Sequence, residues 1–319
     1  GKTNFHFEVA ADLLNEEELN LISTMRPGLI QLEIGVQSTN EQTIKEIHRT
    51  MKFSQVTEVV NRVHAAKNIH QHLDLIAGLP FEDYNSFHKS FCDVYALRPE
   101  QLQLGFLKVL KGSYMEEKTK DYELLYQNRP PYEVLSTKWL PYSDVIRLKG
   151  LEEMVEVYYN SRQFEHTMEL LEQVFGDAFV MFEEMSNYYE EHGYYGVNHN
   201  RVARYEILYA FIKEVALVQY ETLLTEEQFR QTLVMDLYLR ENMKNRPAFA
   251  GDSLVSKEVE RTFYDTEAEE HQYLKGYEKY DKRQLRKMTH LENIDGHLIL
   301  FDYQNRNPLT NQATTYEVI

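Results

Sequence analysis

The sequence predicts an α/β fold in which residues 1–112 contain parallel strands and residues 113–319 form a mainly helical domain. Two observations carry this prediction. Between residue 5 and about residue 110, short apolar runs alternate with helical stretches, a pattern typical of repeated strand–helix units and a parallel sheet. From about Ser113, long helical patterns rich in Glu and Tyr follow one another without intervening strands, so we expect a domain boundary there.

Each part of the chain has its own set of expected elements. In the first part we expect strands at residues 5–10, 29–37, 69–78 and 102–110, with helices at residues 16–25, 41–66 and 84–97. In the second part, apolar residues recur at spacings of three and four and predict a bundle of helices at residues 149–159, 163–175, 178–192, 201–219 and 226–244. A short strand is expected at residues 297–303, hairpinned with the last residues.

The charge of the chain argues against nucleic acid and membrane partners. The formal net charge of −17 repels phosphate backbones and anionic lipid. No apolar run approaches the ~20 residues that a membrane span requires, and the N-terminal sequence has no signal-peptide pattern, so we expect a cytoplasmic protein. The chain lacks an initiator Met and enters a predicted strand at Phe5, which predicts a fragment of a longer protein.

A single cysteine, Cys92, limits the chemistry of the chain. It excludes an internal disulfide and any metal site built from several cysteines of this chain. Cys92 lies in a predicted amphipathic helix beside Phe91 and Val94, where we expect a small buried hydrophobic residue.

The predicted strands carry polar side chains on one face, which is unusual for a parallel sheet. The apolar face consists of Phe5, Phe7, Val9, Leu32, Ile34, Val36, Leu73, Leu75, Ala77, Leu102, Leu104 and Phe106. The other face consists of His6, Glu8, Gln31, Glu33, Gln37, His70, His72, Asp74, Gln101 and Gln103. Because burying unpaired carboxylates costs several kcal/mol each, we expect this face to line a wet or ligand-filled cavity, with its chemistry at the carboxyl ends of the strands. The alternative is a face open to solvent because neighbouring strands are missing.

Three motifs resemble the later strands of one enzyme family. They are Gly35-Val36-Gln37-Ser38, Ile47-His48-Arg49 and Asp74-Leu75-Ile76-Ala77-Gly78-Leu79-Pro80. Their order and spacing resemble radical S-adenosylmethionine enzymes, in the branch that includes coproporphyrinogen dehydrogenases, methylthiotransferases and cobalamin-dependent cyclases and methylases. The resemblance covers about the first 110 residues and implies half of a partial (β/α) TIM-like barrel. The tail, with Pro130-Pro131-Tyr132 and Trp139-Leu140-Pro141-Tyr142, is similar to the C-terminal extension of some cobalamin-binding members.

The resemblance implies that S-adenosylmethionine is bound by Glu8, Gln37, Arg49, Asp74, Gly78, Leu79 and Pro80. Gln37 and Asp74 would hydrogen-bond the ribose hydroxyls, and Arg49 would pair with the methionine carboxylate. Glu8 matches an acidic position near the aminoacyl end, and the Gly-Leu-Pro turn would lie against the adenine. Each has a structural alternative when taken singly: Gln37 and Ser38 as helix caps, Arg49 as a solvated cation at a helix end, and Gly-Leu-Pro as a common turn.

The family's chemistry also implies groups that this chain does not hold by itself. A [4Fe-4S] cluster is bound there by three cysteines, and the single Cys92 does not match that motif. We therefore expect the cluster ligands outside this chain and, in cobalamin-dependent members, a cobalamin domain further upstream. The parent enzyme would act on a small-molecule substrate as an oxidoreductase or transferase, by reductive cleavage to a 5′-deoxyadenosyl radical or by methyl transfer. The piece alone would be inactive, and the sequence assigns no catalytic residue and no metal ligand to it.

Two other functions compete with this interpretation. His70, His72 and Asp74 share one strand face at the spacing of ligands in metal-dependent barrel hydrolases. Alternatively, the helical tail is a non-catalytic partner-binding module, with an aromatic surface formed by Tyr188, Tyr189, Tyr194 and Tyr195. A homodimer that covers the open edge of the barrel would fit either enzyme hypothesis.

Overall fold

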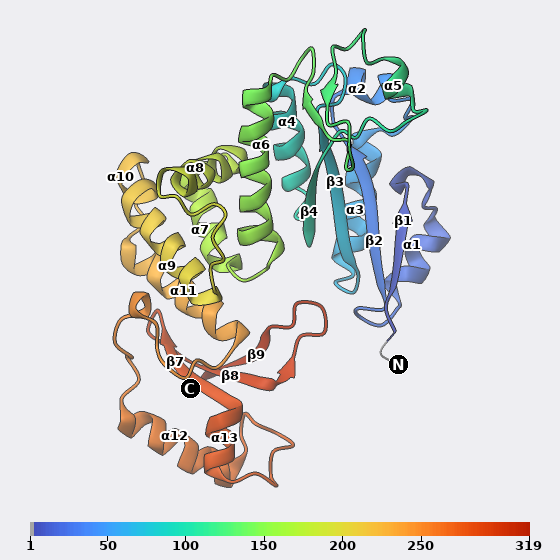
Figure 1. Cartoon of the computed structure of the whole chain (residues 1–319). Helices are drawn as coiled ribbons and strands as arrows, with labels where there is room; N and C mark the ends of the chain where they lie inside the picture. Colours follow the sequence, from blue (N-terminus) through green and yellow to red (C-terminus); the bar gives the residue numbers. More distant parts are fainter. Residues whose placement is uncertain (1–2) are drawn as a thin grey trace. The chain divides into compact units, whose positions relative to one another are not determined.

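Four parallel strands form the sheet at the start of the chain. The computed structural model describes residues 3–319, and its sheet has the order β1-β2-β3-β4, with β1 (Phe5–Val9), β2 (Ile30–Gln37), β3 (His70–Ala77) and β4 (Gln101–Phe106) (Figure 1). The predicted α/β class with a parallel sheet is confirmed. The last strand ends at Phe106 instead of residue 110.

The apolar face of the inner strands is buried, as the sequence predicts. Helices α1 (Glu16–Ser23), α3 (Phe53–Ala65) and α4 (Tyr84–Tyr95) alternate with the strands along the chain. Helix α3 buries Val56, Val59, Val60 and Val63, and Gln71 on β3 donates to the carbonyl of Val60 over 3.1 Å. The prediction is wrong for β1, where Phe5 and Phe7 are 50% and 47% exposed. β1 is an edge strand, so its apolar side chains lack the cover that the inner strands have.

The predicted helix at residues 41–66 is broken into two. Helix α2 (Glu41–Glu46) is followed two residues later by His48, whose φ of +59° is left-handed, and α3 begins only at Phe53. The amide of Arg49 donates to the carbonyl of Ile44, which closes the end of α2 in the manner of a C-cap. The break turns the chain so that the Arg49 side chain donates to the carbonyl of Gly35 on β2.

The chain divides into two compact units, and the division does not fall at residue 113. The first unit contains residues 1–160 and 177–193, and the second contains residues 161–176 and 194–319. The first unit therefore also holds α5 (Tyr114–Glu117), β5 (Leu125–Tyr126), β6 (Val134–Ser136), α6 (Tyr142–Met154), a π-helical turn (Val155–Asn160) and α8 (Ala178–Glu191). Two of these elements contact the sheet or its helices. Asn160, in the π-helical turn, exchanges two hydrogen bonds of 2.9 Å with the backbone of Leu102 on β4, and Phe179 on α8 packs on Phe91 of α4.

The second unit consists of a helical bundle and a small antiparallel sheet. Its helices are α7 (Glu165–Phe175), α9 (Arg201–Phe211) with a π-helical turn (Ile212–Ala216), α10 (Leu217–Gln219), α11 (Glu226–Arg240), α12 (Lys257–Glu270) and α13 (Lys282–Met288). The sheet joins β7 (Thr289–Ile294), β8 (His297–Arg306) and β9 (Ala313–Val318), so the predicted terminal strand exists and has two partners. Asp295 and Gly296 both have positive φ, as the tight turn between β7 and β8 requires.

The predicted aromatic surface of the tail is wrong for its first two members. Tyr188 and Tyr189 are 4% and 3% exposed and belong to the core of the first unit, where the hydroxyls of Tyr158 and Tyr189 are 2.7 Å apart. Tyr194 and Tyr195 are half-buried and fall in the second unit. Among the described residues, no helix combines the length and the apolar character that crossing a bilayer demands.

Candidate functional site

The polar face of the parallel sheet is present and largely covered. The register sets Glu33 beside His72, and two residues further along it sets Gly35 beside Asp74 and Asp74 beside Gln103. The side chains of Glu33, His72 and Asp74 are only 24%, 7% and 17% exposed. The face is therefore not simply open to solvent at its centre. Towards β1 it opens, since Glu8 is exposed.

Gln37 and Arg49 converge on Gly35. The pairing of β2 with β3 shifts register between Gly35 and Gln37, and Gln37 has a φ of +68°. As a result the Gln37 amide folds back, and its Nε2 atom lies 2.6 Å from the position that a Cβ atom on Gly35 would take. The two terminal nitrogens of Arg49 lie 3.5 and 3.6 Å from the same position. A Cβ atom on residue 35 would therefore displace the Gln37 amide, whereas it would meet the Arg49 nitrogens at ordinary contact distances.

Gln37 and Asp74 line one cavity at the carboxyl ends of the strands. Its volume is about 430 Å³, and its walls are Gln37, Asp74, Leu75, Ile76, Gln103, Leu104, Gly105, Phe106, Leu107, Lys108, Glu133 and Glu152. Arg49 lines a second hollow of about 430 Å³ beside it, together with Ser38, Thr39, Glu41, Ile44, Lys45, Thr50, Met51, Lys52, Phe53 and Ser54. The guanidinium therefore approaches Gly35 from the side of the loop between α2 and α3.

The electrostatics of the site centre on Asp74. Burial, the neighbouring carboxyl of Glu33 and the more distant Glu8 raise the pKa of Asp74 to about 7, and Arg49 opposes the rise. Burial also lowers the pKa of His72 below its usual range. A carboxyl that is half protonated near neutral pH can donate as well as accept a hydrogen bond. Asp74 Oδ1 is buried and lies 3.2 Å from Nε2 of His72.

The predicted turn at residues 78–80 packs against the apolar cluster that contains Val134. Gly78 has a φ of +84°, and a Cβ atom there would lie 2.8 Å from Val134. Leu79 is 3% exposed and packs in the same apolar cluster as Val134. The carbonyl of Pro80 accepts a hydrogen bond of 2.8 Å from Thr43 Oγ1. Contact of this turn with an adenine stays a prediction, as does a role for Glu8.

The helix-cap alternative for Gln37 and Ser38 is wrong. The side chain of Asn40 caps α2 by accepting from the amides of Gln42 and Thr43. Ser38 instead donates to the buried carboxyl of Glu82 over 2.6 Å. Arg49 is exposed, as the solvated-cation alternative expects, and its guanidinium also donates to the carbonyl of Gly35 on β2. The structure thus brings Gln37, Arg49 and Asp74 together around one residue.

Two groups of side chains in the first unit have the donor atoms of a metal site. In the first group, one atom each from Glu33, His72 and Asp74 lies within 4.8 Å of the others. His70, which the sequence placed in a metal set with His72 and Asp74, is not a member of this group, and Glu33 takes its place. The second group is His88, Cys92 and Asp177, which sequence reasoning missed. Cys92 is half-buried beside a carboxylate and is not the buried hydrophobic residue that we expected.

Comparison with known proteins identifies the family of the chain. Residues 120–316 match the model of DUF4080, described as a protein of unknown function. Since this match covers more than half of the 319 residues, the chain belongs to the DUF4080 family. No curated protein matches the sequence.

Solved structures of two enzymes are similar to part of the chain. Coproporphyrinogen III oxidase (HemN) from Escherichia coli, a radical SAM enzyme, is 16% identical over 46% of this chain and 31% of that one, with a TM-score of 0.34. The radical S-adenosylmethionine methyltransferase TsrM from Kitasatospora setae, with cobalamin and a [4Fe-4S] cluster bound, is 12% identical over 43% and 27%, with a TM-score of 0.33. Both belong to the enzyme class that the three motifs resemble. Each match spans less than a third of the solved enzyme's length.

Proposed function

We propose that the first unit binds S-adenosylmethionine at the carboxyl ends of β2 and β3, as part of a radical S-adenosylmethionine enzyme. The observation that carries the proposal is the convergence of Gln37 and Arg49 on Gly35, directly beside Asp74. Gln37, Arg49 and Asp74 come from three separate motifs of the sequence, and each offers a different functional group. The amide and the carboxyl suit the two ribose hydroxyls, and the guanidinium suits a carboxylate.

The charges around Asp74 fit the same ligand. S-adenosylmethionine carries a positive sulfonium, a positive ammonium and one carboxylate. Glu33 and Glu8 add negative potential near Asp74, and Arg49 supplies one positive group. A cationic ligand with a single carboxylate is therefore stabilised in one orientation, with the carboxylate towards Arg49.

Gly35 fits the proposal because the Gln37 and Arg49 side chains both approach it. Its missing side chain makes room for the Gln37 amide, whose Nε2 would otherwise meet a Cβ atom at 2.6 Å. The left-handed backbone of Gln37 holds that amide over β2. The exposed Phe5 and Phe7 on the edge strand β1 suit a sheet that continues in a larger barrel.

The [4Fe-4S] cluster of such enzymes does not fit the residues of this chain. One cysteine cannot supply three thiolates. We therefore assign to this chain the binding and orientation of the cosubstrate and derive no redox step from it. The reaction type, whether oxidation or methyl transfer, and any use of cobalamin belong to the complete enzyme.

The proposal is tested by titrating the purified chain with S-adenosylmethionine and following saturation-transfer NMR. Because metal chelation is missing, we expect saturable binding near millimolar, about −4 kcal/mol. Gln37→Ala should weaken it about tenfold by removing the amide. Gln31→Ala is the matched control, since Gln31 lies on the same face of β2 at the opposite end. Absence of saturable binding, or equal loss in both variants, contradicts the proposal.

A second measurement tests the division of labour. The chain, prepared without iron, is incubated with S-adenosylmethionine and a strong reductant, and 5′-deoxyadenosine is measured. We expect none, because no described residue can deliver an electron to the sulfonium. Reductive cleavage by the iron-free chain would overturn the assignment of the cluster to other parts of the enzyme.

A further inference from the structure

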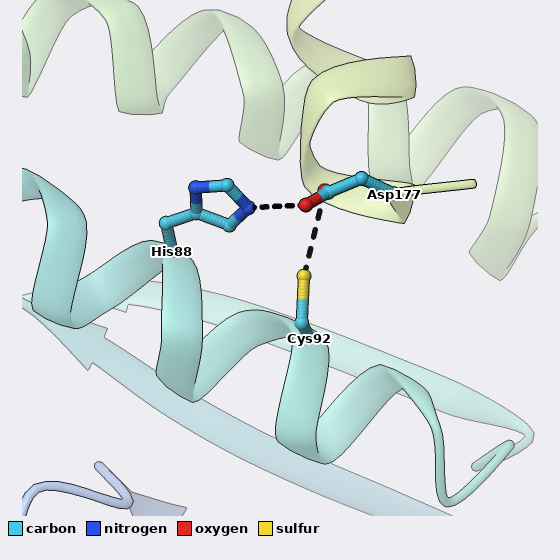
Figure 2. A group of neighbouring side chains, drawn as sticks. All are labelled: His88, Cys92 and Asp177. Carbon is cyan, nitrogen blue, oxygen red and sulfur yellow. Dashed lines mark hydrogen bonds and ion pairs between the residues drawn. The ribbon is translucent and has the colours of Figure 1, made fainter. Parts of the chain in front are cut away.

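A cluster of three different donor side chains lies between α4 and α8 of the first unit, away from the site described above. We call His88, Cys92 and Asp177 the α4–α8 cluster (Figure 2). His88 Nε2 lies 2.8 Å from Asp177 Oδ2, and Cys92 Sγ lies 3.6 Å from Asp177 Oδ1. Figure 2 shows both side chains of α4 pointing towards the same carboxylate. An imidazole, a thiol and a carboxylate thus meet at one point.

The local sequence explains why these side chains meet. His88 and Cys92 are four residues apart on α4 and therefore lie on one face of the helix. Asp177 is the N-cap of α8, and its Oδ1 atom accepts from the amide of Val180 over 3.0 Å. The ring of His88 stacks on Phe179 with centroids 4.3 Å apart. The helix start and the stacking hold all three donor groups in place without a ligand.

A nucleophilic role for Cys92 does not fit this arrangement. The thiol and the imidazole both contact the carboxylate of Asp177, and no hydrogen bond between His88 and Cys92 prepares the imidazole to take the thiol proton. Burial and the nearby Asp177 raise the pKa of Cys92 to about 11, which keeps the thiol protonated at neutral pH. A bound cation would favour the deprotonated thiol, because it stabilises the thiolate and can be coordinated by all three side chains at once.

We propose that the α4–α8 cluster is a binding site for a divalent cation of the softness of Zn²⁺, held by Cys92 Sγ, His88 Nε2 and one carboxylate oxygen of Asp177. In tetrahedral zinc sites the bonds of about 2.0–2.3 Å set neighbouring ligand atoms about 3.4–3.6 Å apart. The distance of 3.6 Å from Cys92 Sγ to Asp177 Oδ1 already has that value. His88 Nε2 lies 2.8 Å from the other oxygen, Oδ2, and one donor atom from each of the three side chains falls within 4.8 Å of the others, so the donors must draw together around a bound cation.

The exposure of the cluster leaves a fourth position for water. The side chains of His88 and Asp177 are 30% and 37% exposed, so solvent reaches the point where the donors meet. Three protein ligands with one open position are the pattern of zinc sites that bind an exchangeable ligand. On binding, the cation displaces the thiol proton of Cys92 to solvent, and no electron is transferred.

Cobalt substitution tests the site, because Cys92 is the only cysteine of the chain. The full chain, freed of metal by chelation, is titrated with Co²⁺ and followed by absorption. We expect a thiolate-to-cobalt charge-transfer band that saturates at one equivalent and disappears when Zn²⁺ is added. Cys92→Ser should abolish the band, and His88→Ala should weaken Co²⁺ binding by about tenfold or more.

Matched variants separate ligation from folding. Asp177→Asn keeps an N-cap residue for α8 but removes the charge, so we expect an unchanged circular dichroism spectrum and weaker Co²⁺ binding. His64→Ala, which removes a half-exposed histidine from α3, should change neither the circular dichroism spectrum nor the affinity for Co²⁺. A folded chain that binds Co²⁺ without a thiolate band places the cation at another group, such as Glu33, His72 and Asp74, and overturns the proposal. A band that is unaffected by His88→Ala and Asp177→Asn also overturns it.

Discussion

Asp74 lies directly beside Gly35 in the parallel pairing of β3 with β2. The Gln37 amide and the Arg49 guanidinium both lie next to the point where a side chain on Gly35 would begin, and the guanidinium also donates to the Gly35 carbonyl. Asp74 also lines the cavity of about 430 Å³. The glycine therefore acts as the point around which the three polar side chains are arranged.

The first prediction concerns the room at Gly35. Gly35→Ala places a Cβ atom 2.6 Å from Gln37 Nε2, so the flexible amide must move away while the backbone remains. We expect affinity for S-adenosylmethionine to fall about tenfold, about 1.4 kcal/mol, with the melting temperature nearly unchanged. Gln31→Ala is the control, because Gln31 lies at the opposite end of β2 and lines neither hollow. If both variants bind equally well, the Gln37 amide does not contact the ligand.

The second prediction concerns Asp74 and pH. Its pKa of about 7 in the folded chain lies above the ordinary value of 3.8, so between these values the folded chain holds a proton that the unfolded chain releases. The contribution of Asp74 to the free energy of unfolding is therefore lost as the pH rises through this window. Asp74→Asn should remove this loss. Above pH 7 we expect the free energy of unfolding of this variant to exceed that of the natural chain by on the order of 3 kcal/mol.

Urea unfolding at pH 4 to 8 measures the effect as the difference between Asp74→Asn and the unaltered chain. Asp121→Asn is the control, since the Asp121 side chain is 63% exposed and its removal should leave the pH profile parallel to that of the natural chain. A difference that does not change with pH would show that Asp74 has the same pKa in the folded and unfolded states.

Much of the sheet and its polar face could be predicted from the sequence. Strand residues alternate strictly, so the faces of β2 and β3 follow from the position of Leu32, Leu73 and their neighbours. The meeting of Gln37 and Asp74 then follows from parallel pairing, because strand ends lie together at one edge. The approach of Arg49 could be inferred only from the family resemblance.

The remaining features depend on conformations and contacts that the sequence pattern does not show. Just after α2 ends at Glu46, His48 adopts a left-handed conformation although it is not glycine, and no helix breaker marks this position in the sequence. The strand β7 did have a signal, the Asp295-Gly296 dipeptide before a β-rich run. For the α4–α8 cluster the spacing of His88 and Cys92 was visible, but Asp177 is 85 residues beyond Cys92 and arrives only through the packing of α8.

The third prediction concerns the second unit, where Asp236 joins α11 to the start of α7. Asp236 is 2% exposed and accepts hydrogen bonds from the amides of His166 and Thr167, from the Thr167 hydroxyl and from the His166 ring. Asp236→Ala leaves these buried donors without an acceptor, and we expect it to lower the free energy of unfolding by about 3 kcal/mol. Asp252→Ala, at an exposed position of the same unit, should change it by less than about 0.5 kcal/mol in the same urea titration.

The last prediction separates two roles of Arg49. Its guanidinium donates to the carbonyl of Gly35, so it can hold the backbone, bind a ligand carboxylate, or do both. Arg49→Met keeps the length of the side chain and removes every donor. If the proposed orientation of S-adenosylmethionine is right, this variant binds it about tenfold more weakly but binds the decarboxylated analogue within about twofold of the natural chain.

Arg49→Lys adds a test of geometry. Lysine keeps the charge but not the planar fork, so it should restore only part of the affinity for the carboxylate-containing ligand. Equal losses for both ligands in Arg49→Met would mean that Arg49 acts only through Gly35, as a positioning residue for β2. In that case the carboxylate must be bound elsewhere, and Lys108, which lines the cavity beside Gln103, is the next cation to substitute.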